Sequence, residues 1–173
     1  MKKYYVNVDD QCTAYWYKDA KRTILHREDG PAVVYANGDK EWWVNGKHHR
    51  TDGPAYEGAN GTKQWYVNGL HHRTDGPAHE GADGSKAWWV NGNRHREDGP
   101  AVIFANGDKF WYVNDRLHRI DGPAVVRTNG AKAWYINGEK LTEEEFLERT
   151  RPVEELTIAQ IEQLLGKRIK VVK

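Results

Sequence analysis

The chain has a single cysteine, Cys12, among 173 residues, so it cannot form an internal disulfide, and this favours a reducing compartment. It also has no excess of charge: 26 basic and 25 acidic side chains leave a formal net charge of +1, too little to attract nucleic acid or an anionic membrane. No segment is long and apolar enough to span a membrane, and no apolar run suits a signal peptide. We therefore expect a cytoplasmic protein.

Motifs of known catalytic chemistry are missing as well. The sequence contains no nucleophile elbow, phosphate-binding loop, cysteine pair or zinc-protease motif. Hydrophobic residues make up only 38% of the chain, whereas aromatic residues reach 12% and include eight tryptophans. This composition favours a thin sheet with aromatic stripes over a thick globular core.

A repeated unit of 23 residues fills most of the chain. The run from His26 to Ala32 returns four times, in step with a ladder of tryptophans: it begins again at His49, His72, His95 and His118, beside Trp42, Trp65, Trp88, Trp111 and Trp134. A fixed period predicts a stacked repeat array, which presents one surface many times and so favours binding over catalysis. We number the copies one to five from these five histidines.

Each copy reads as a hairpin followed by a short returning segment. In copy one, residues 32–36 and 39–44 are β-prone runs, and Asn-Gly pairs follow them at 37–38 and 45–46. Asn-Gly is the strongest short hairpin signal, because both central residues of a type I′ turn need positive φ. A single copy cannot bury its side chains, so neighbouring copies must stack.

Turn geometry also predicts which side chains share a face. If both Asn-Gly pairs form two-residue turns, Val33 lies opposite Trp42 and His49 also lies opposite Trp42. The lysines that follow the first turn, such as Lys40, then share this face with the tryptophans. A β-bulge would exchange the faces beyond it.

The segment from Ala36 to His49 resembles the MORN repeat in its period and in its two glycine turns, and the likeness extends over residues 24–140. It departs from that family where Asp-Gly-Pro-Ala replaces the usual glycine pair and where Trp42 replaces the usual tyrosine. Together with the tail at 156–172, the Asp-Gly-Pro variant resembles uncharacterised proteins of tailed bacteriophages. The resemblance implies an elongated single-layer sheet and contacts with proteins or lipids, and it names no reaction.

We therefore expect a mainly β protein: an elongated, twisted, single-layer antiparallel sheet of about five hairpin repeats over residues 1–140, with a small helical cap at 141–173. Residues 1–25 are expected to form a degenerate first copy around Trp16. Capping boxes at Thr142 and Thr157 predict two helices, and residues 169–172 predict a short final strand. The tail either caps the exposed end of the array or binds a partner.

The repeated histidines and acids do not predict a metal or catalytic centre. With two strands per copy at ~4.8 Å each, equivalent residues in successive copies lie roughly 10 Å apart, whereas zinc ligands converge within ~2.0–2.3 Å of the ion. We expect structural histidines, no metal and no cofactor. Arg50 and Asp52, with their copies, predict a ladder of salt bridges and turn caps.

Copies two and three carry Gly58 and Gly81 where copies one and four have larger aromatic residues, which predicts a notch in the middle of the sheet. Its expected lining combines aromatic planes with ammonium groups: Tyr35, Tyr56, Gly58, Lys63, Trp65, His79, Gly81, Lys86, Trp88 and Phe104. Such a lining suits a base and its phosphates. Alternatively, the C-terminal helix fills the notch, or the glycines only let the sheet coil.

The sequence thus favours a non-enzymatic binding protein that presents a repeated β surface to a macromolecular partner, most simply a protein. The phage resemblance implies a host protein as that partner, met in the cytoplasm of the host cell. The alternative is a sponge that binds a nucleotide in the central notch. Neither a membrane nor nucleic acid is expected as a partner.

Overall fold

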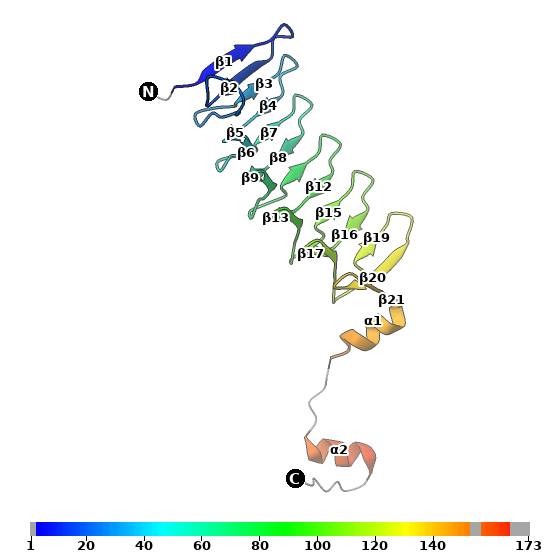
Figure 1. Ribbon diagram of the computed structural model, residues 1–173. Coiled ribbons are helices and arrows are strands. Elements are labelled where there is room, and N and C mark those ends of the chain that lie inside the picture. Colours follow the sequence, from blue (N-terminus) through cyan, green and yellow to red (C-terminus); the bar gives the residue numbers. More distant parts are fainter. Residues whose placement is uncertain (1–2, 153–156, 167–173) are drawn as a thin grey trace.

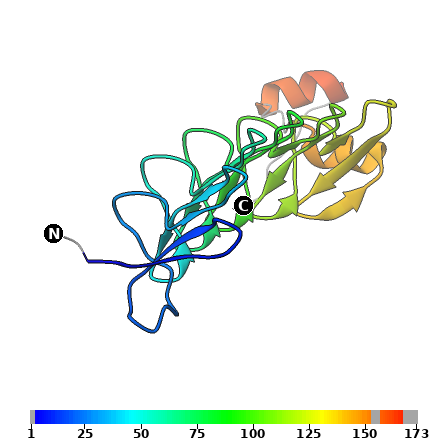
Figure 2. The same cartoon turned by 90° about the horizontal axis from the view of Figure 1, so that it is seen from above.

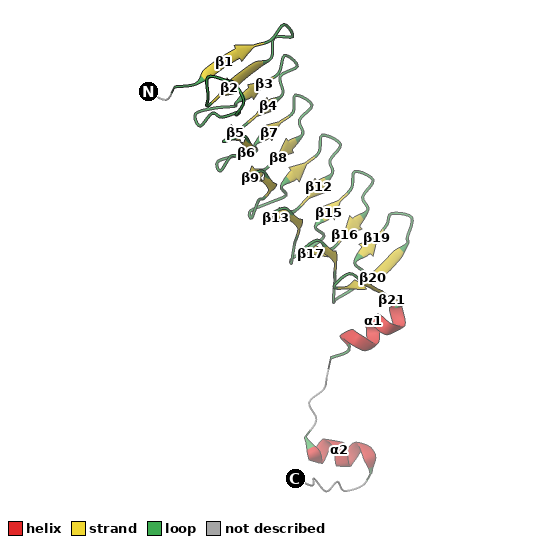
Figure 3. Ribbon diagram, viewed as in Figure 1, coloured by secondary structure: helices red, strands yellow, loops and turns green. Residues whose placement is uncertain are grey.

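The computed structural model describes residues 3–152 and 157–166. Its body is one antiparallel sheet of 13 strands with four two-stranded hairpins beside it, and two helices follow. Figure 1 shows the strands stepping along an elongated body from the N-terminal end to the helices. Figure 3 shows that loops join very short strands throughout. The expected mainly β, elongated antiparallel fold is confirmed.

Strands of the long sheet follow one another in space in the order of the sequence, with the hairpin strands left out. They are β1 (Tyr5–Val8), β2 (Ala14–Tyr17), β3 (Val33–Val34), β4 (Lys40–Glu41), β7 (Tyr56–Glu57), β8 (Lys63–Gln64), β11 (His79–Glu80), β12 (Lys86–Ala87), β15 (Val102–Ile103), β16 (Lys109–Phe110), β19 (Val125–Val126), β20 (Lys132–Ile136) and β21 (Glu139–Leu141).

The returning segment of each of the first four copies forms a separate hairpin. These hairpins are β5 (Trp43–Val44) with β6 (Lys47–His48), β9 (Tyr66–Val67) with β10 (Leu70–His71), β13 (Trp89–Val90) with β14 (Asn93–Arg94), and β17 (Tyr112–Val113) with β18 (Arg116–Leu117). Seen from above in Figure 2, the same loop outline recurs from copy to copy. Each of these four copies therefore contributes two strands to the long sheet and one hairpin to the row beside it, whereas copy five contributes β19, β20 and β21 to the long sheet.

The prediction of a two-residue turn between β3 and β4 is wrong. Val33 pairs with Glu41 and not with Trp42, so the loop contains three residues, 36–38. This shift of one residue moves Trp42 to the opposite face, because successive side chains of a strand alternate between faces. The lysine of β4, Lys40, shares that opposite face with Trp42, while Glu41 lies on the face of Val33.

Asn37 explains the longer loop. Its side-chain Oδ1 accepts a hydrogen bond from the backbone N–H of Asp39 at 3.0 Å, and only Gly38 takes positive φ, at 95°. An asparagine that bonds the backbone two residues on builds a turn of its own without entering the left-handed region. The same bond recurs in each copy, from the N–H of Thr62, Ser85, Asp108 and Ala131.

The second Asn-Gly pair does form the expected two-residue turn. Asn45 and Gly46 have φ of 52° and 73°, as a type I′ turn requires, and Trp43 pairs with His48 across it. The expected pairing of Trp42 with His49 is confirmed by a hydrogen bond from the His49 N–H to the Trp42 carbonyl at 3.0 Å.

The N-terminal segment, which the sequence predicts to be a degenerate copy, extends the sheet by two strands. β1 pairs with β2 along its whole length, and β2 pairs with β3. The backbone N–H of Trp16 donates to the Ala32 carbonyl at 2.8 Å, as the backbone N–H of Trp42 does to the Ala55 carbonyl at 2.8 Å. The longer loop between Trp16 and His26 therefore leaves the backbone bond from the tryptophan to the buried alanine unchanged.

The core is thin. The alanine of each Asp-Gly-Pro-Ala run is completely buried: Ala32, Ala55, Ala78, Ala101 and Ala124. Among the described residues, Val33 is the largest fully buried side chain. Stability must therefore come from contacts between neighbouring copies more than from one large apolar cluster.

Helix α1 (Glu143–Thr150) caps the C-terminal end of the sheet. The expected capping box joins Thr142 and Glu145, and Phe146, only 4% exposed, packs with α1 against β20 and β21. Arg149 adds two hydrogen bonds to the Glu139 carboxylate, at 2.7 and 2.8 Å. The cap prediction is confirmed for this helix.

Helix α2 (Ile158–Leu165) has the expected capping box at Thr157 and a left-handed Gly166 at its C-terminus. Figure 1 shows it beyond α1, away from the sheet. The side chains of Ile158, Leu164 and Leu165 are exposed. The alternative in which the C-terminal helix fills a central notch therefore does not hold for α2. The strand expected at 169–172 lies outside the described residues. Neither described helix has the length and apolar character needed to cross a bilayer.

Candidate functional site

One face of the array carries a ladder of arginine and tryptophan that recurs in every copy. The guanidinium carbon lies 4.0 to 4.3 Å from the indole centroid in each of five pairs: Arg27 with Trp16, Arg50 with Trp42, Arg73 with Trp65, Arg96 with Trp88, and Arg119 with Trp111. These distances are typical of cation–π contacts. We call this side the constant face.

The same arginines also hold the Asp-Gly-Pro loops. Arg73 donates from Nε to Asp75 at 2.8 Å and from Nη1 to the Pro77 carbonyl at 3.2 Å and to Glu80 at 3.1 Å. The bond from Arg73 holds the pKa of the Asp75 carboxyl below its usual value. The predicted ladder of salt bridges and turn caps is confirmed.

The glycine of the Asp-Gly-Pro run is needed for a close approach. A Cβ atom added to Gly76 would lie 2.9 Å from Cζ of Arg73, and the corresponding distances are 2.9 to 3.2 Å at the other four glycines. Gly76 does not take positive φ, so a turn alone does not demand it. The sequence analysis assigned this glycine no role of its own, although it recurs in every copy.

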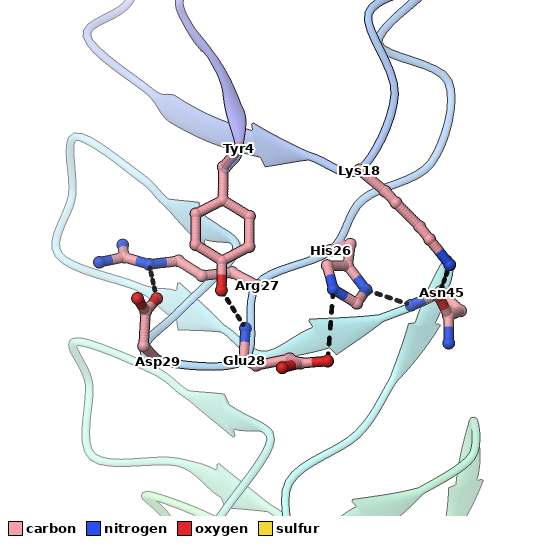
Figure 4. Close-up of polar contacts among 7 residues, drawn as sticks. All are labelled: Tyr4, Lys18, His26, Arg27, Glu28, Asp29 and Asn45. Carbon is pink, nitrogen blue, oxygen red and sulfur yellow. Dashed lines mark hydrogen bonds and ion pairs between the residues drawn. The ribbon is translucent and has the colours of Figure 1, made fainter. Parts of the chain in front are cut away.

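The repeated histidines join neighbouring hairpins. In each copy Nδ1 accepts a hydrogen bond from the backbone N–H of the asparagine 19 residues later, at 3.0 to 3.3 Å: His26 from Asn45, His49 from Asn68, His72 from Asn91, His95 from Asn114 and His118 from Asn137. Figure 4 shows the first of these pairs, with Lys18 also bonded to the Asn45 side chain. The expectation of structural histidines is confirmed.

The opposite side carries three columns of side chains that differ between copies, and we call it the variable face. In copy one, the Tyr35 hydroxyl donates to Glu41 Oε1 at 3.2 Å and Nε1 of Trp43 donates to Glu41 Oε2 at 2.7 Å. Burial and the nearby Glu41 raise the pKa of Tyr35 to about 12. Three columns of this face vary: the equivalents of Val33, of Tyr35 and of Glu41.

Stacked rings run along the variable face. The ring centroids of Trp43, His48, Tyr66, His71 and Trp89 follow one another at 3.8, 5.0, 4.0 and 5.3 Å. The ladder continues through the Arg94 guanidinium, whose Cζ lies 4.0 Å from the centroid of Tyr112. It therefore spans four copies without a break.

His71 is neutral within this ladder. Burial lowers its pKa to about 4, and the charges of His79 and His48 act in the same direction. Its Nδ1 atom is buried and has no hydrogen-bond partner in the described part of the chain. The ring therefore serves as a stacking element in the interior of the ladder.

The variable face is hollowed over Ala87. The hollow has a volume of about 300 Å³, and Trp89, Val102, Phe104, Phe110 and Tyr112 are among the residues that line it. Phe104 and Phe110 meet edge to face, with centroids 5.2 Å apart. We call this feature the Ala87 hollow; it lies between copies three and four.

The loops beside the hollow lack a link that the other loops have. The Asp39 carboxylate accepts the Ala59 N–H of the next copy at 2.7 Å, and Asp108 likewise accepts the Thr128 N–H at 2.8 Å. At the corresponding position, Ser85 donates to Asp83 of its own loop at 2.6 Å. Within the described residues, no such hydrogen bond joins the loops of copies three and four.

The structure divides the predicted site residues between the two faces. The variable face holds Tyr35, Tyr56, Gly58, His79, Gly81 and Phe104, which follow the register of Val33 and Glu41. The other four predicted residues belong to the constant face: Lys63, Trp65, Lys86 and Trp88. The predicted combination of lysines and tryptophans around the glycines is therefore wrong, because the three-residue loop shifts the register by one.

The predicted double-glycine notch is also filled. A Cβ atom at Gly58 would lie 2.7 Å from Asn60 Oδ1 and 3.1 Å from the Tyr56 hydroxyl, and one at Gly81 would collide with Ser85 and Asp83. The glycines thus make room for polar side chains of their own loops. A hollow of the variable face lies instead over Ala87, in the column of Glu41, which the sequence analysis did not compare between copies.

No protein-family model matches the chain, and no curated protein matches it. The candidate site therefore depends on the geometry of the variable face.

Proposed function

We propose that the protein is a non-catalytic binding protein whose variable face engages a protein partner. One observation carries the proposal: the recurring arginine, tryptophan and histidine side chains are engaged in contacts that hold the array together, whereas the differing equivalents of Val33, Tyr35 and Glu41 share one face around the Ala87 hollow. Side chains that make no contact required by the stacking can differ between copies, and such differences can distinguish one partner from another.

The arrangement of the acids supports a non-enzymatic role. Asp52, Asp75, Asp98 and Asp121 each bind the arginine of their own loop, at 2.7 to 2.9 Å. They recur along the array and do not converge on one point, as the carboxylates of a hydrolase or nuclease must.

The resemblance to MORN repeats and to phage proteins favours a host protein as the partner, met in the host cytoplasm. We do not retain the nucleotide sponge. Its motive was a cluster of lysines and tryptophans around the glycines, and Lys63, Trp65 and Trp88 lie on the constant face instead.

Affinity capture from the native host, followed by mass spectrometry, tests the proposal with two matched variants. Phe104→Asp places a charge on the variable face at an exposed side chain, and Lys109→Asp places the same charge on the constant face of the adjacent strand. We expect Phe104→Asp to lose a captured protein that Lys109→Asp retains, and the purified pair to behave in the same way in direct binding. Loss with Lys109→Asp alone, or turnover abolished by a single substitution, would contradict the proposal.

A further inference from the structure

The Ala87 hollow arises because copy three lacks two side chains that other copies have. At the positions of Tyr35 and Glu41, the five copies carry Tyr35 with Glu41, Gly58 with Gln64, Gly81 with Ala87, Phe104 with Phe110, and Arg127 with Ala133. Copy three alone has a small residue at both positions. Large rings of copy four, Phe104 and Phe110, stand directly beside the gap.

Ala87 also removes a hydrogen-bond acceptor. In copy one the indole N–H of Trp43 donates to Glu41, and in copy two the Tyr66 hydroxyl donates to Gln64, each at 2.7 Å. Trp89 is the equivalent of Trp43 and lines the hollow, but Ala87 offers no oxygen. Within the described residues, Nε1 of Trp89 has no acceptor.

We propose that the Ala87 hollow receives a tyrosine side chain of the protein partner, whose phenol oxygen accepts a hydrogen bond from the Trp89 indole N–H. This inference rests on the proposed function and names the chemistry that its variable face recognises. The tyrosine ring of the partner would occupy the space that larger side chains fill in other copies. Its phenol oxygen would replace the acceptor that Ala87 lacks.

The size and lining of the hollow favour one aromatic ring. A volume of about 300 Å³ lies at the lower limit of ligand sites, which suits a single ring system. Phe104, Phe110, Tyr112 and Val102 provide apolar and aromatic walls. Aromatic rings prefer the edge-to-face and offset contacts that such walls offer.

The charges disfavour a phosphate-bearing ligand. Two cations line the hollow: Arg94 is already bound to Asp115 and lies over the Tyr112 ring, and Lys86 extends from its strand to the constant face. Asp83 adds a further carboxylate on the neighbouring loop. A phosphate would meet these acids without an unpaired arginine, whereas a phenol brings no charge.

Amide NMR of the full chain tests the inference with N-acetyl-tyrosinamide as the probe. We expect a saturable downfield shift of the Trp89 indole resonance, assigned with Trp89→Phe, and millimolar affinity. N-acetyl-phenylalaninamide lacks the oxygen, and its affinity should be about fivefold lower, in line with the loss of one neutral hydrogen bond.

Two matched variants locate the binding. Ala87→Gln gives copy three the side chain that copy two already tolerates, and it should weaken the probe at least tenfold; Ala133→Gln makes the same change in copy five and should have no effect. Equal binding to wild type and Ala87→Gln, no shift at Trp89, or tighter binding of AMP than of the tyrosine probe would overturn the inference. Since the probe needs no partner, its failure leaves the capture experiment as an independent test of the proposed function.

Discussion

The Nδ1 atom of His72 accepts a hydrogen bond from the backbone N–H of Asn91 at 3.2 Å, across 19 residues of sequence. Asn91 has a φ of 50° in the type I′ turn of hairpin β13–β14, whereas His72 extends the preceding hairpin. A backbone donor that points out of its own turn is thus satisfied by a side chain of the neighbouring hairpin. This relationship holds the row of hairpins together.

Replacing His72 by phenylalanine should remove this acceptor while keeping a flat ring. We expect a loss of about 1 kcal/mol in the free energy of unfolding, measured by urea denaturation. The same change at His118, far along the array, should add to it within about 0.5 kcal/mol. A His72→Phe protein as stable as the wild type would show that the hydrogen bond contributes nothing.

The close approach of Gly76 to Arg73 predicts strong coupling between these residues. Gly76→Ala should destabilise the protein by about 1–3 kcal/mol, because the added methyl group forces the guanidinium away from Trp65 and Asp75. In an Arg73→Ala background the same change should cost little. A double-mutant cycle by chemical denaturation measures the coupling, and additive effects would rule out the steric explanation.

Burial of His71 predicts a loss of stability in mild acid. Its folded-state pKa is lowered to about 4, so the unfolded chain binds the proton first as the pH falls. The neutral His71 ring therefore makes its full contribution to the free energy of unfolding above the unfolded-state pKa, about 6.5. This contribution decreases as the pH falls from there to about 4. Paired carboxyls such as Asp75, whose pKa is lowered by Arg73, act below that window.

His71→Leu should abolish this slope, since copy four carries Leu117 at the equivalent position. Denaturation of both proteins at pH 7 and pH 5 makes the comparison. An identical decrease in the two proteins would mean that other groups cause the acid sensitivity.

Phe146 predicts a local effect at the end of the array. Phe146→Ala should cost about 3–5 kcal/mol of packing in the cap, as for other buried phenylalanines. Hydrogen exchange should then accelerate at Trp134 in β20 and remain slow at Trp42, because each copy contacts only its neighbours. Uniform acceleration along the chain would indicate one cooperative unit instead.

The array could be predicted from the sequence because the same turn and strand motifs recur five times at a fixed period. The faces could not be predicted, because the Asn-Gly pair has two outcomes in this chain. Asn37 bonds the Asp39 N–H through its own side chain and makes a three-residue loop, whereas Asn45 takes positive φ and gives its N–H to His26. The choice depends on a partner that is distant in sequence, and a dipeptide does not reveal it.

The prediction of the site residues was wrong for the same reason. A shift of one residue sent Lys63 and Trp65 to the far face and brought the column of Glu41 to the near one. The signal for the Ala87 hollow was nevertheless present, as a column that runs from Glu41 through Gln64 and Ala87 to Phe110. Only the observed register shows that this column and that of Tyr35 share a face.

The joint between hairpins uses the same donor and the same acceptor at every junction, from His26 with Asn45 to His118 with Asn137. A whole unit of the gene can therefore be duplicated or deleted by recombination without creating a junction of a new kind. The Ala87 hollow belongs to one unit and its neighbour, so such events would change its distance from either end of the molecule while leaving its walls intact. The number of units, and with it the position of the Ala87 hollow along the array, can thus change independently of the residues that build the hollow.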